Sequence, residues 1–264
     1  MTDPDFDEMI GFQSELQEPA FGAPEAPDLD CTALFLDVDG TLVEIAERPD
    51  AVLVPDATRT LLRNLHHRTD GATALVSGRR IGDLDQFFPD FEGIIVGSHG
   101  AEWRDSGKLW RHSAQDSSDL ARLVQMVRAW SASEPDVLFE EKPCSVVLHF
   151  RQAPDRMAEG LKFMESITNH VEGFVLHQAK MAAEIHPEDV SKRHAIETLL
   201  ERWPTRMPVS FGDDLTDEGM FEVTNRFGGL SIKVGEGKTG ARFRLAGPAE
   251  VTDTLGDWLG VQSR

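Results

Sequence analysis

Short apolar runs along the chain alternate with segments in which apolar residues recur every three or four positions. The apolar runs, which we interpret as buried strands, are residues 33–37, 72–76, 94–96, 209–211 and 231–234. The segments with helical spacing that lie among them are residues 58–67, 81–88 and 191–202. Strands without an alternating polar face are typical of a parallel sheet that is buried on both faces. The pattern therefore predicts an α/β fold with a doubly wound, Rossmann-like parallel sheet.

The pattern changes between about residues 111 and 187. This stretch predicts two helices and three strands, at 117–130, 144–151, 154–170, 174–176 and 181–185. Such a mixture is typical of a small α+β unit. We therefore expect a discontinuous core, formed by residues 30–110 and 188–262, with an α+β domain inserted at 111–187.

The first 29 residues are rich in Asp, Glu and Pro and lack apolar periodicity. A segment of this composition buries too little apolar surface to become ordered, so residues 1–29 are expected to form a disordered acidic tail. A short docking segment is the alternative, and its apolar residues would be Phe6, Met9, Ile10 and Phe12.

The charge of the whole chain limits its partners. Lys and Arg total 26 against 46 Asp and Glu, which gives a formal net charge of −20. This balance argues against nucleic acid or an anionic membrane as partner, because both require a basic surface. A phosphorylated substrate would require the few cations, or a metal ion, to be concentrated at its site.

Two cysteines, Cys31 and Cys144, do not form a disulfide framework and suit a reducing compartment. No apolar run approaches the roughly 20 residues needed to span a bilayer. The acidic N-terminus also lacks the pattern of a secretory signal. We therefore expect a cytoplasmic protein.

Two aspartates, Asp37 and Asp39, end the first predicted strand, and a Gly40-Thr41 turn follows them. Parallel sheets bind ligands beyond the carboxyl ends of their strands, so both carboxylates should reach the binding edge. One could attack phosphorus as a nucleophile while the other transfers protons. A calcium loop is the alternative, but it fails because Thr41 occupies its fifth position and Arg48 stands where a bidentate Glu is required.

Three further segments fall at the expected site: Ser77-Gly78-Arg79, Lys192, and residues 212–218 with the sequence GDDLTDE. The last run could instead cap a helix, since Asp and Thr do this well. As a calcium loop it fails, because Asn225 occupies the twelfth position counted from Asp214. In order and separation, these segments and the aspartate pair resemble the four motifs of the haloacid-dehalogenase-like phosphatases over about residues 30–260.

More specific matches make the chain similar to the trehalose-6-phosphate phosphatases within that superfamily. Besides residues 212–218, they are Ser98-His99-Gly100-Ala101-Glu102, Glu140-Glu141-Lys142, His149-Phe150-Arg151 and Lys180-Met181-Ala182-Ala183-Glu184. The resemblance implies a haloacid-dehalogenase core with the inserted domain as a cap. It also implies hydrolysis of trehalose 6-phosphate to trehalose and phosphate through an aspartyl-phosphate.

The resemblance implies a role for each motif residue. Asp37 is the expected nucleophile, and Asp39 is the expected proton donor and acceptor. Ser77 and the amides near Gly40 are expected to hold phosphate oxygens. Lys192 is expected to neutralise both the phosphate and Asp37.

Mg²⁺ is the implied cofactor, held by Asp37, the backbone carbonyl of Asp39, and Asp213. Asp214 and Asp217 are expected to support these ligands rather than to contact the ion. All-oxygen ligation suits Mg²⁺. A phosphate dianion beside three carboxylates requires such a cation, because each unit-charge repulsion costs about 4 kcal/mol at 4 Å and an effective dielectric near 20.

The cap is expected to recognise the sugar, because disaccharide hydroxyls bind carboxylate acceptors and cationic donors of fixed geometry. The leading candidates are Glu140, Lys142 and Glu184. The other expected substrate-binding residues are Arg79, His99, Glu102, Arg151 and Lys180.

The sequence departs from the family pattern at two positions. Ser191-Lys192-Arg193 stands where the family usually has Asn-Lys-Gly, so Arg193 competes with Lys192 for the phosphate role. His186 stands where the family often has Arg or Lys, and no role carries over to it. A separate stretch, residues 235–240, looks like a nucleotide loop, but Walker A would need a glycine at Ile232, so we interpret it as an ordinary loop.

Two other functions stay open at this point. A phosphatase of the same superfamily could act on glucosylglycerol phosphate or sucrose phosphate. A non-catalytic module could instead partner a trehalose-phosphate synthase, but such a module should have lost Asp37, Asp39 or Asp213, and all three are present. An active enzyme with a small-molecule substrate could also be functionally paired with a synthase.

Overall fold

The computed structural model describes residues 18–45, 52–179 and 181–260. Contacts within the chain divide it into two units, which are described separately here. The first unit comprises residues 1–99, 103–109 and 192–264, and the second comprises residues 100–102 and 110–191.

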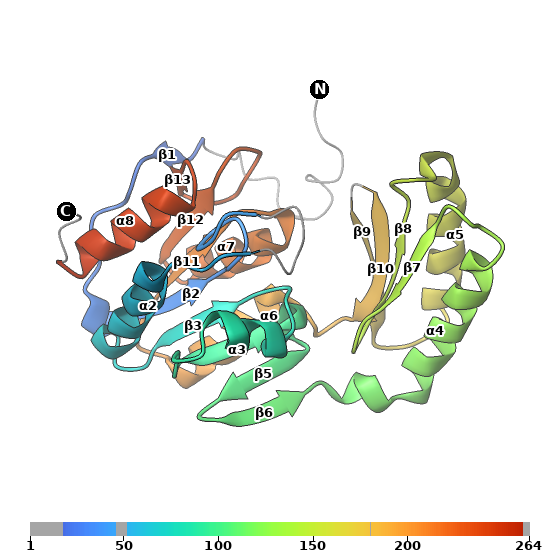
Figure 1. Ribbon diagram of the computed structural model, residues 1–264, viewed down its shortest axis with the longest axis horizontal. Coiled ribbons are helices and arrows are strands. Elements are labelled where there is room, and N and C mark those ends of the chain that lie inside the picture. The colour runs from blue at the N-terminus through green and yellow to red at the C-terminus, as the bar shows by residue number, and fades with distance from the viewer. Residues whose placement is uncertain (1–17, 46–51, 180, 261–264) are drawn as a thin grey trace. The chain divides into compact units, whose positions relative to one another are not determined.

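A nine-stranded sheet runs through the described part of the first unit and its junctions (Figure 1). In spatial order its strands are β1 (Ala20–Phe21), β13 (Phe243–Leu245), β12 (Leu230–Val234), β11 (Met207–Gly212), β2 (Thr32–Leu36), β3 (Thr73–Val76), β4 (Ile94–Gly97), β5 (Glu102–Asp105) and β6 (Lys108–Arg111). Every pairing from β1 to β4 is parallel. The carboxyl ends of these strands therefore share one edge of the sheet.

Helices cover both faces of this sheet, because successive residues of each strand point to opposite sides. Leu34 and Leu36 of β2 belong to the apolar cluster that includes residues of α2 (Asp56–Arg68), α3 (Ile81–Phe87) and α8 (Pro248–Trp258). Phe35 of the same strand belongs to the cluster that includes residues of α6 (Lys192–Arg202) and α7 (Glu218–Arg226). This three-layer arrangement explains why β2 is an uninterrupted apolar run.

The second unit is a four-stranded antiparallel sheet with two helices on one face. Its strand order is β7 (Leu138–Glu141), β8 (Val146–His149), β10 (Ala182–Pro187) and β9 (Phe174–Ala179). The helices are α4 (Ser118–Ser131) and α5 (Met157–Thr168), whose apolar residues form one cluster with Ala183 and Ile185. Glu184, which lies between these two residues, therefore points to the opposite face of the sheet.

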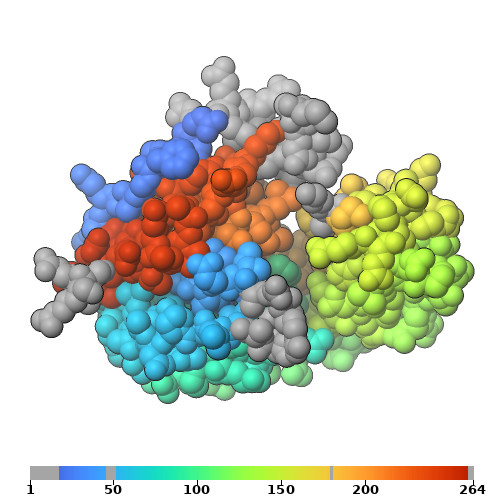
Figure 2. All heavy atoms as spheres, turned by 45° about the horizontal axis from the view of Figure 1, so that its top comes forward, coloured from blue at the N-terminus to red at the C-terminus, as the bar shows by residue number. Residues whose placement is uncertain are grey.

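The N-terminal segment differs from the expectation. Residues 1–17 lie outside the described residues, but Ala20–Phe21 form β1, which pairs with Phe243 and Arg244 of β13. Figure 2 shows the blue N-terminal segment lying along the red C-terminal one. The expected tail was therefore too long, because a two-residue edge strand is held by backbone hydrogen bonds and leaves no apolar pattern in the sequence.

Other elements were also not predicted. They are the strands β5, β6, β7 and β13, the helices α7 and α8, 3₁₀ turns at Leu29–Cys31, Ser113–Asp116 and Leu215–Asp217, and a turn with positive φ at Ser98–Gly100. Strands β6 and β7 consist of exposed or half-buried residues, so they lack the apolar run used to predict the buried strands. Among the residues that the structure describes, no helix combines the length and the hydropathy needed to cross a bilayer.

Candidate active site

Three carboxylates meet at the carboxyl edge of the parallel sheet. Asp37 follows β2 and Asp213 follows β11, and these two strands are paired neighbours. Asp217 lies one turn beyond Asp213. Each of the three offers a carboxylate oxygen that lies within 4.8 Å of the others.

The absence of a side chain at Gly40 allows the Asp213 carboxylate to approach the turn. Its φ of +77° is in the left-handed region, where a side chain is strained. A Cβ at Gly40 would overlap the carboxylate of Asp213. Glycine at this position therefore allows Asp213 to lie directly against the turn that follows Asp39.

The backbone amides of Gly40 and Thr41 donate hydrogen bonds to carbonyls of the same turn. The amide of Gly40 donates to the carbonyl of Val43 over 2.8 Å, and that of Thr41 donates to the carbonyl of Val38 over 3.3 Å. The expectation that amides near Gly40 hold phosphate oxygens was therefore wrong for these two, because closing the tight turn consumes their hydrogen bonds.

Lys192 lies among the carboxylates and is only 3% exposed. Its Nζ donates to Asp37 Oδ1 over 2.6 Å and to Asp217 Oδ1 over 2.7 Å. Arg193, the other candidate for this role, forms an ion pair with Glu222 of α7. In the structure, the cation beside Asp37 is therefore Lys192.

Residues 212–218 both cap a 3₁₀ turn and provide carboxylates to the site. Asp214 accepts from the amide of Thr216 over 2.8 Å, so this aspartate is the N-cap of the following 3₁₀ turn. Asp217 Oδ2 accepts from the amides of Asp213 and Asp214 over 2.9 and 3.0 Å. With Lys192 on its other oxygen, Asp217 holds the loop in place and leaves Asp213 to face the site.

The electrostatics of the cluster favour a cation. Burial raises the pKa of Asp37 to about 7, although Lys192 opposes this shift. Burial also raises the pKa of Asp213 to about 6, and the charge of Asp217 adds to that effect. Burial alone would lower the pKa of Lys192, but Asp217 and Asp37 outweigh it and raise the pKa, so the ammonium stays charged. One lysine thus faces more negative charge than it can neutralise.

The donor set fits Mg²⁺, which prefers hard oxygen ligands. Because both oxygens of Asp217 are engaged, Asp37 and Asp213 are the side chains best placed to hold the ion. The contribution of the Asp39 backbone carbonyl stays a prediction.

Arg79 contacts Asp39 through a two-pronged ion pair. Its Nε donates to Asp39 Oδ2 over 2.5 Å and its Nη2 to Asp39 Oδ1 over 2.7 Å. Ser77 is buried at the end of β3, and its hydroxyl accepts from the amide of Arg79 over 3.1 Å. The structure therefore brings Arg79 to the carboxylate of Asp39, whereas the substrate contact expected of it stays a prediction.

His99 lies against the segment that follows β3. Its amide donates to the carbonyl of Ser77 over 3.0 Å, and a Cβ on Gly78 would lie 2.6 Å from His99 Nε2. Ser98 and His99 both have positive φ, of 49° and 56°. Positive φ is unfavourable for residues other than glycine, so contacts with the surrounding structure must stabilise this turn beside the site.

The expected sugar-binding residues lie in the second unit. Lys142 Nζ lies 3.2 Å from both oxygens of Glu184, and the Ser145 hydroxyl donates to Glu184 Oε1 over 2.5 Å. Glu140 Oε2 lies 2.8 Å from His149 Nε2. The structure thus forms a Lys142–Glu184–Ser145 cluster on the face of the sheet opposite the helices.

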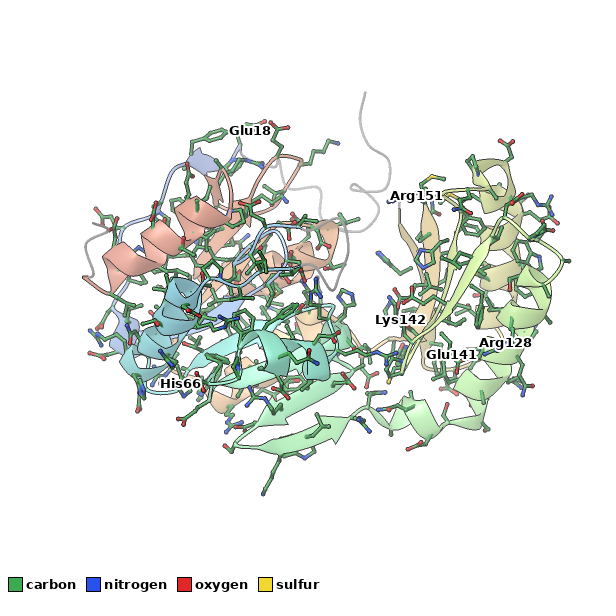
Figure 3. All side chains as sticks on the ribbon, viewed as in Figure 1. Glu18, His66, Arg128, Glu141, Lys142 and Arg151 are labelled. Carbon is green, nitrogen blue, oxygen red and sulfur yellow. The ribbon has the colours of Figure 1, made fainter. Side chains whose placement is uncertain are left out.

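Arg151 lies apart from that cluster. Arg151 is exposed and lies at the other end of the sheet from Lys142 (Figure 3), beside a cavity of about 510 Å³ that His149 also lines. Glu102 is buried, 3.6 Å from Arg111 Nε. Lys180 lies outside the described residues.

Lys233 was missed by the sequence analysis. This lysine of β12 is buried, and its Nζ donates to the backbone carbonyl of Asp213. Burial lowers the pKa of Lys233 although the charge of Asp213 opposes this. A charged residue inside the apolar run 231–234 was the signal that could have identified it.

The loop at residues 235–240 is folded onto side chains of the protein itself. Glu218 Oε2 accepts from the amide of Gly240 over 2.8 Å, and Arg244 Nη2 donates to the carbonyl of Gly237 over 2.7 Å. The acidic side chain at the Gly240 amide would repel a phosphate, which agrees with the interpretation as an ordinary loop.

Comparison with known proteins gives consistent matches over most of the chain. The model of the family described as trehalose-phosphatase matches residues 35–249. The chain is 42% identical over 212 residues to the probable trehalose-phosphate phosphatase of Sinorhizobium fredii (strain NBRC 101917 / NGR234), covering 79% of each protein. It is 40% identical over 236 residues to the trehalose-6-phosphate phosphatase of Escherichia coli (strain K12), covering 88% of each.

Solved structures agree with these matches. The crystal structure of a trehalose-6-phosphate phosphatase related protein superposes with a TM-score of 0.69 at 28% identity, covering 87% of this chain and 98% of that one. A haloacid dehalogenase-like hydrolase from Bacteroides thetaiotaomicron has a similar fold, with a TM-score of 0.62 at 16% identity, covering 86% of this chain and 98% of that one. The predicted α/β fold of this type is therefore confirmed.

Proposed function

This chain belongs to the trehalose-phosphatase family, and we propose that it hydrolyses trehalose 6-phosphate to trehalose and inorganic phosphate through an aspartyl-phosphate. Its relatives are named as phosphatases, so the chain is a phosphoric monoester hydrolase. The observation that carries the mechanism is the pairing of buried Lys192 with Asp37, within reach of Asp213.

In the first step, a carboxylate oxygen of Asp37 forms a bond to phosphorus while the bond from phosphorus to the sugar oxygen breaks. Asp39 gives its proton to the departing sugar oxygen, which leaves as a neutral hydroxyl. Lys192 fixes Asp37 through Oδ1 and offsets negative charge at the reacting centre.

In the second step, the oxygen of a water molecule forms a bond to phosphorus and the bond to Asp37 breaks. Asp39 takes the proton of this water and so returns to its starting state. Phosphate leaves with the water oxygen, and Asp37 is regenerated as a carboxylate.

Mg²⁺, when bound, would act as a Lewis acid on the phosphoryl oxygens and offset their charge. Asp37 and Asp213 would hold it together with the backbone carbonyl of Asp39. The raised pKa values of Asp37 and Asp213 support this assignment, because burial makes the charged form of each carboxylate costly without a neutralising cation.

The second unit is the proposed cap that recognises the disaccharide. Glu184 and Lys142 offer charged acceptors and donors held by each other and by Ser145, so their geometry is set before the sugar arrives. Glu140 and His149 form a second such pair. We also propose that the enzyme acts in the cytoplasm, downstream of a trehalose-phosphate synthase.

Phosphate release from a panel of sugar phosphates tests this proposal. Trehalose 6-phosphate should be the best substrate, ahead of glucosylglycerol phosphate and sucrose phosphate, and activity should vanish in EDTA and return with Mg²⁺. Asp37→Asn should abolish turnover while the protein stays folded. Equal, slow hydrolysis of all three would refute the substrate, and full activity in EDTA would refute the metal.

A further inference from the structure

The guanidinium of Arg79 forms a bidentate ion pair with Asp39. Two of its nitrogens donate to the two oxygens of that carboxylate, over 2.5 and 2.7 Å. A fork of this kind sets the plane of the carboxylate as well as its position, which a single hydrogen bond does not. Hydrogen bonding to Asp39 is also the largest cause of the raised pKa of Arg79.

Arg79 is itself held in place. Its side chain is 14% exposed, against 31% for that of Asp39. The Cζ of Arg79 lies 4.8 Å from the centre of the Phe87 ring in α3, an arrangement in which a cation is attracted to the ring face. The Arg79 amide is fixed by the hydroxyl of Ser77. The more buried, anchored partner therefore orients the more exposed one.

We propose that Arg79 is a positioning residue, which fixes the place and plane of the Asp39 carboxylate through both oxygens and keeps hold of its carbonyl oxygen when the other oxygen carries the proton. This inference rests on the proposed function, in which Asp39 gives a proton to the leaving group and later takes one from water. Without the fork, the Asp39 side chain can rotate about its own bonds, and both proton transfers lose their geometry. Arg79 then acts on kcat through Asp39, and it contributes little to substrate binding.

The two half-reactions respond differently to the loss of Arg79. The alkoxide of a sugar is a poor leaving group and needs the proton of Asp39, so both steps should slow with trehalose 6-phosphate. The 4-nitrophenolate ion leaves without a proton, so with 4-nitrophenyl phosphate the first step should persist. The attack of water still needs Asp39 as base, so the aspartyl-phosphate should accumulate.

The test compares Arg79→Met, Arg79→Lys and a matched control, Arg80→Met, which removes the neighbouring, exposed arginine. Arg79→Met should lower kcat for trehalose 6-phosphate about 100-fold, with KM changed less than threefold. With 4-nitrophenyl phosphate it should enlarge the rapid burst of nitrophenolate relative to the unaltered protein, towards one per active site. Arg79→Lys keeps the charge but lacks the fork, so it should recover only part of kcat. Arg80→Met should match the unaltered protein.

Three outcomes would overturn the proposal. A raised KM with unchanged kcat would make Arg79 a substrate ligand. Equal losses on both substrates without a larger burst would assign it another role in the site. Full recovery by Arg79→Lys would show that charge alone matters. Melting temperatures identify any variant that fails to fold. If Arg79→Met does not fold, the kinetics of the milder Arg79→Lys variant test the proposal. Because the burst uses an aryl phosphate, it tests Arg79 even if trehalose 6-phosphate is not the substrate.

Discussion

Lys192 Nζ lies 2.6 Å from Asp37 Oδ1, although 155 positions separate the two residues in the sequence. The same ammonium lies 2.7 Å from Asp217 Oδ1. A buried lysine is costly unless it is paired, and two carboxylates here compensate it. The packing of α6 against the sheet therefore delivers the cation that pairs with Asp37, the proposed nucleophile.

Replacing Lys192 should cost both stability and activity. Lys192→Met leaves Asp37 and Asp217 buried without their cation, which should lower the free energy of unfolding of the metal-free protein by about 3–5 kcal/mol. Turnover should also be lost. Urea unfolding in EDTA measures the first effect and phosphate release in Mg²⁺ measures the second.

A double variant separates these two effects. Lys192→Met with Asp217→Asn removes one buried charge, and the remaining amide oxygen of residue 217 can still accept from the amides of Asp213 and Asp214. It should regain part of the stability and none of the activity. A Lys192→Met protein as stable as the unaltered one would contradict the buried triad.

Phosphatase activity should require glycine at position 40, because a side chain there would displace Asp213. Gly107 serves as a control that separates this effect from backbone strain. Gly40→Ala introduces backbone strain of about 1–2 kcal/mol and also displaces the carboxylate of Asp213. Gly107 has a similar φ, +73° against +77°, but a Cβ there would meet nothing within 4 Å. Both alanine variants should lower the melting temperature, but only Gly40→Ala should abolish phosphatase activity. Comparable activity in the two variants would show that Asp213 tolerates displacement.

Lys142 should affect sugar binding rather than phosphoryl transfer. Lys142→Met removes charged donors that face Glu184, so KM for trehalose 6-phosphate should rise about 10- to 100-fold, the range expected for a charge-assisted hydrogen bond. Turnover of 4-nitrophenyl phosphate, which has no disaccharide, should be unchanged. Steady-state kinetics with both substrates measure this difference.

Arg128→Met is the matched control. Arg128 of α4 forms an ion pair with Glu141, the residue before Lys142, and thus lies with the helices (Figure 3). Its loss should leave KM for the sugar phosphate unchanged. A similar rise in KM for both variants would point to loosening of β7 rather than to a sugar contact.

Cys144 should contribute to stability in a pH-dependent way. Burial raises the pKa of its thiol to about 11, from an ordinary value of 9.0. A group whose pKa is raised on folding stabilises the folded state below its unfolded pKa and loses that effect as pH rises. The unfolding free energy of the protein relative to Cys144→Ala should therefore fall between about pH 9 and pH 11.

Thiol labelling gives an independent check on Cys144. In a Cys31→Ser protein, which removes the exposed cysteine, the remaining thiol should resist labelling at pH 8 and react fully in urea. Rapid labelling of the folded protein would mean that Cys144 is accessible, and the predicted loss of stability at high pH would then have no basis.

Local patterns in the sequence were enough to place the main strands and the chemistry at their ends. Leu34, Phe35 and Leu36 form a continuous apolar run because helices pack on both faces of β2. A strand that is buried on both faces needs apolar residues at every position, and such a run can be recognised in the sequence. The edge strands β1 and β6 were not visible. Hydrogen bonds of the backbone hold them, and these bonds place little demand on side chains.

The contacts within the site could not be read from the chain. Asp39 and Arg79 both stood out as chemical candidates, but their pairing depends on how the turn after β2 meets the turn after β3. The hydrogen bond of the Gly40 amide to Val43 and the pairing of Lys192, rather than Arg193, with Asp37 likewise follow from packing. Shifts of a fraction of an ångström decide which hydrogen bonds form. Residue types and their periodicity specify burial and the kind of chemistry, whereas the partner of each charged group is settled only when distant segments pack together.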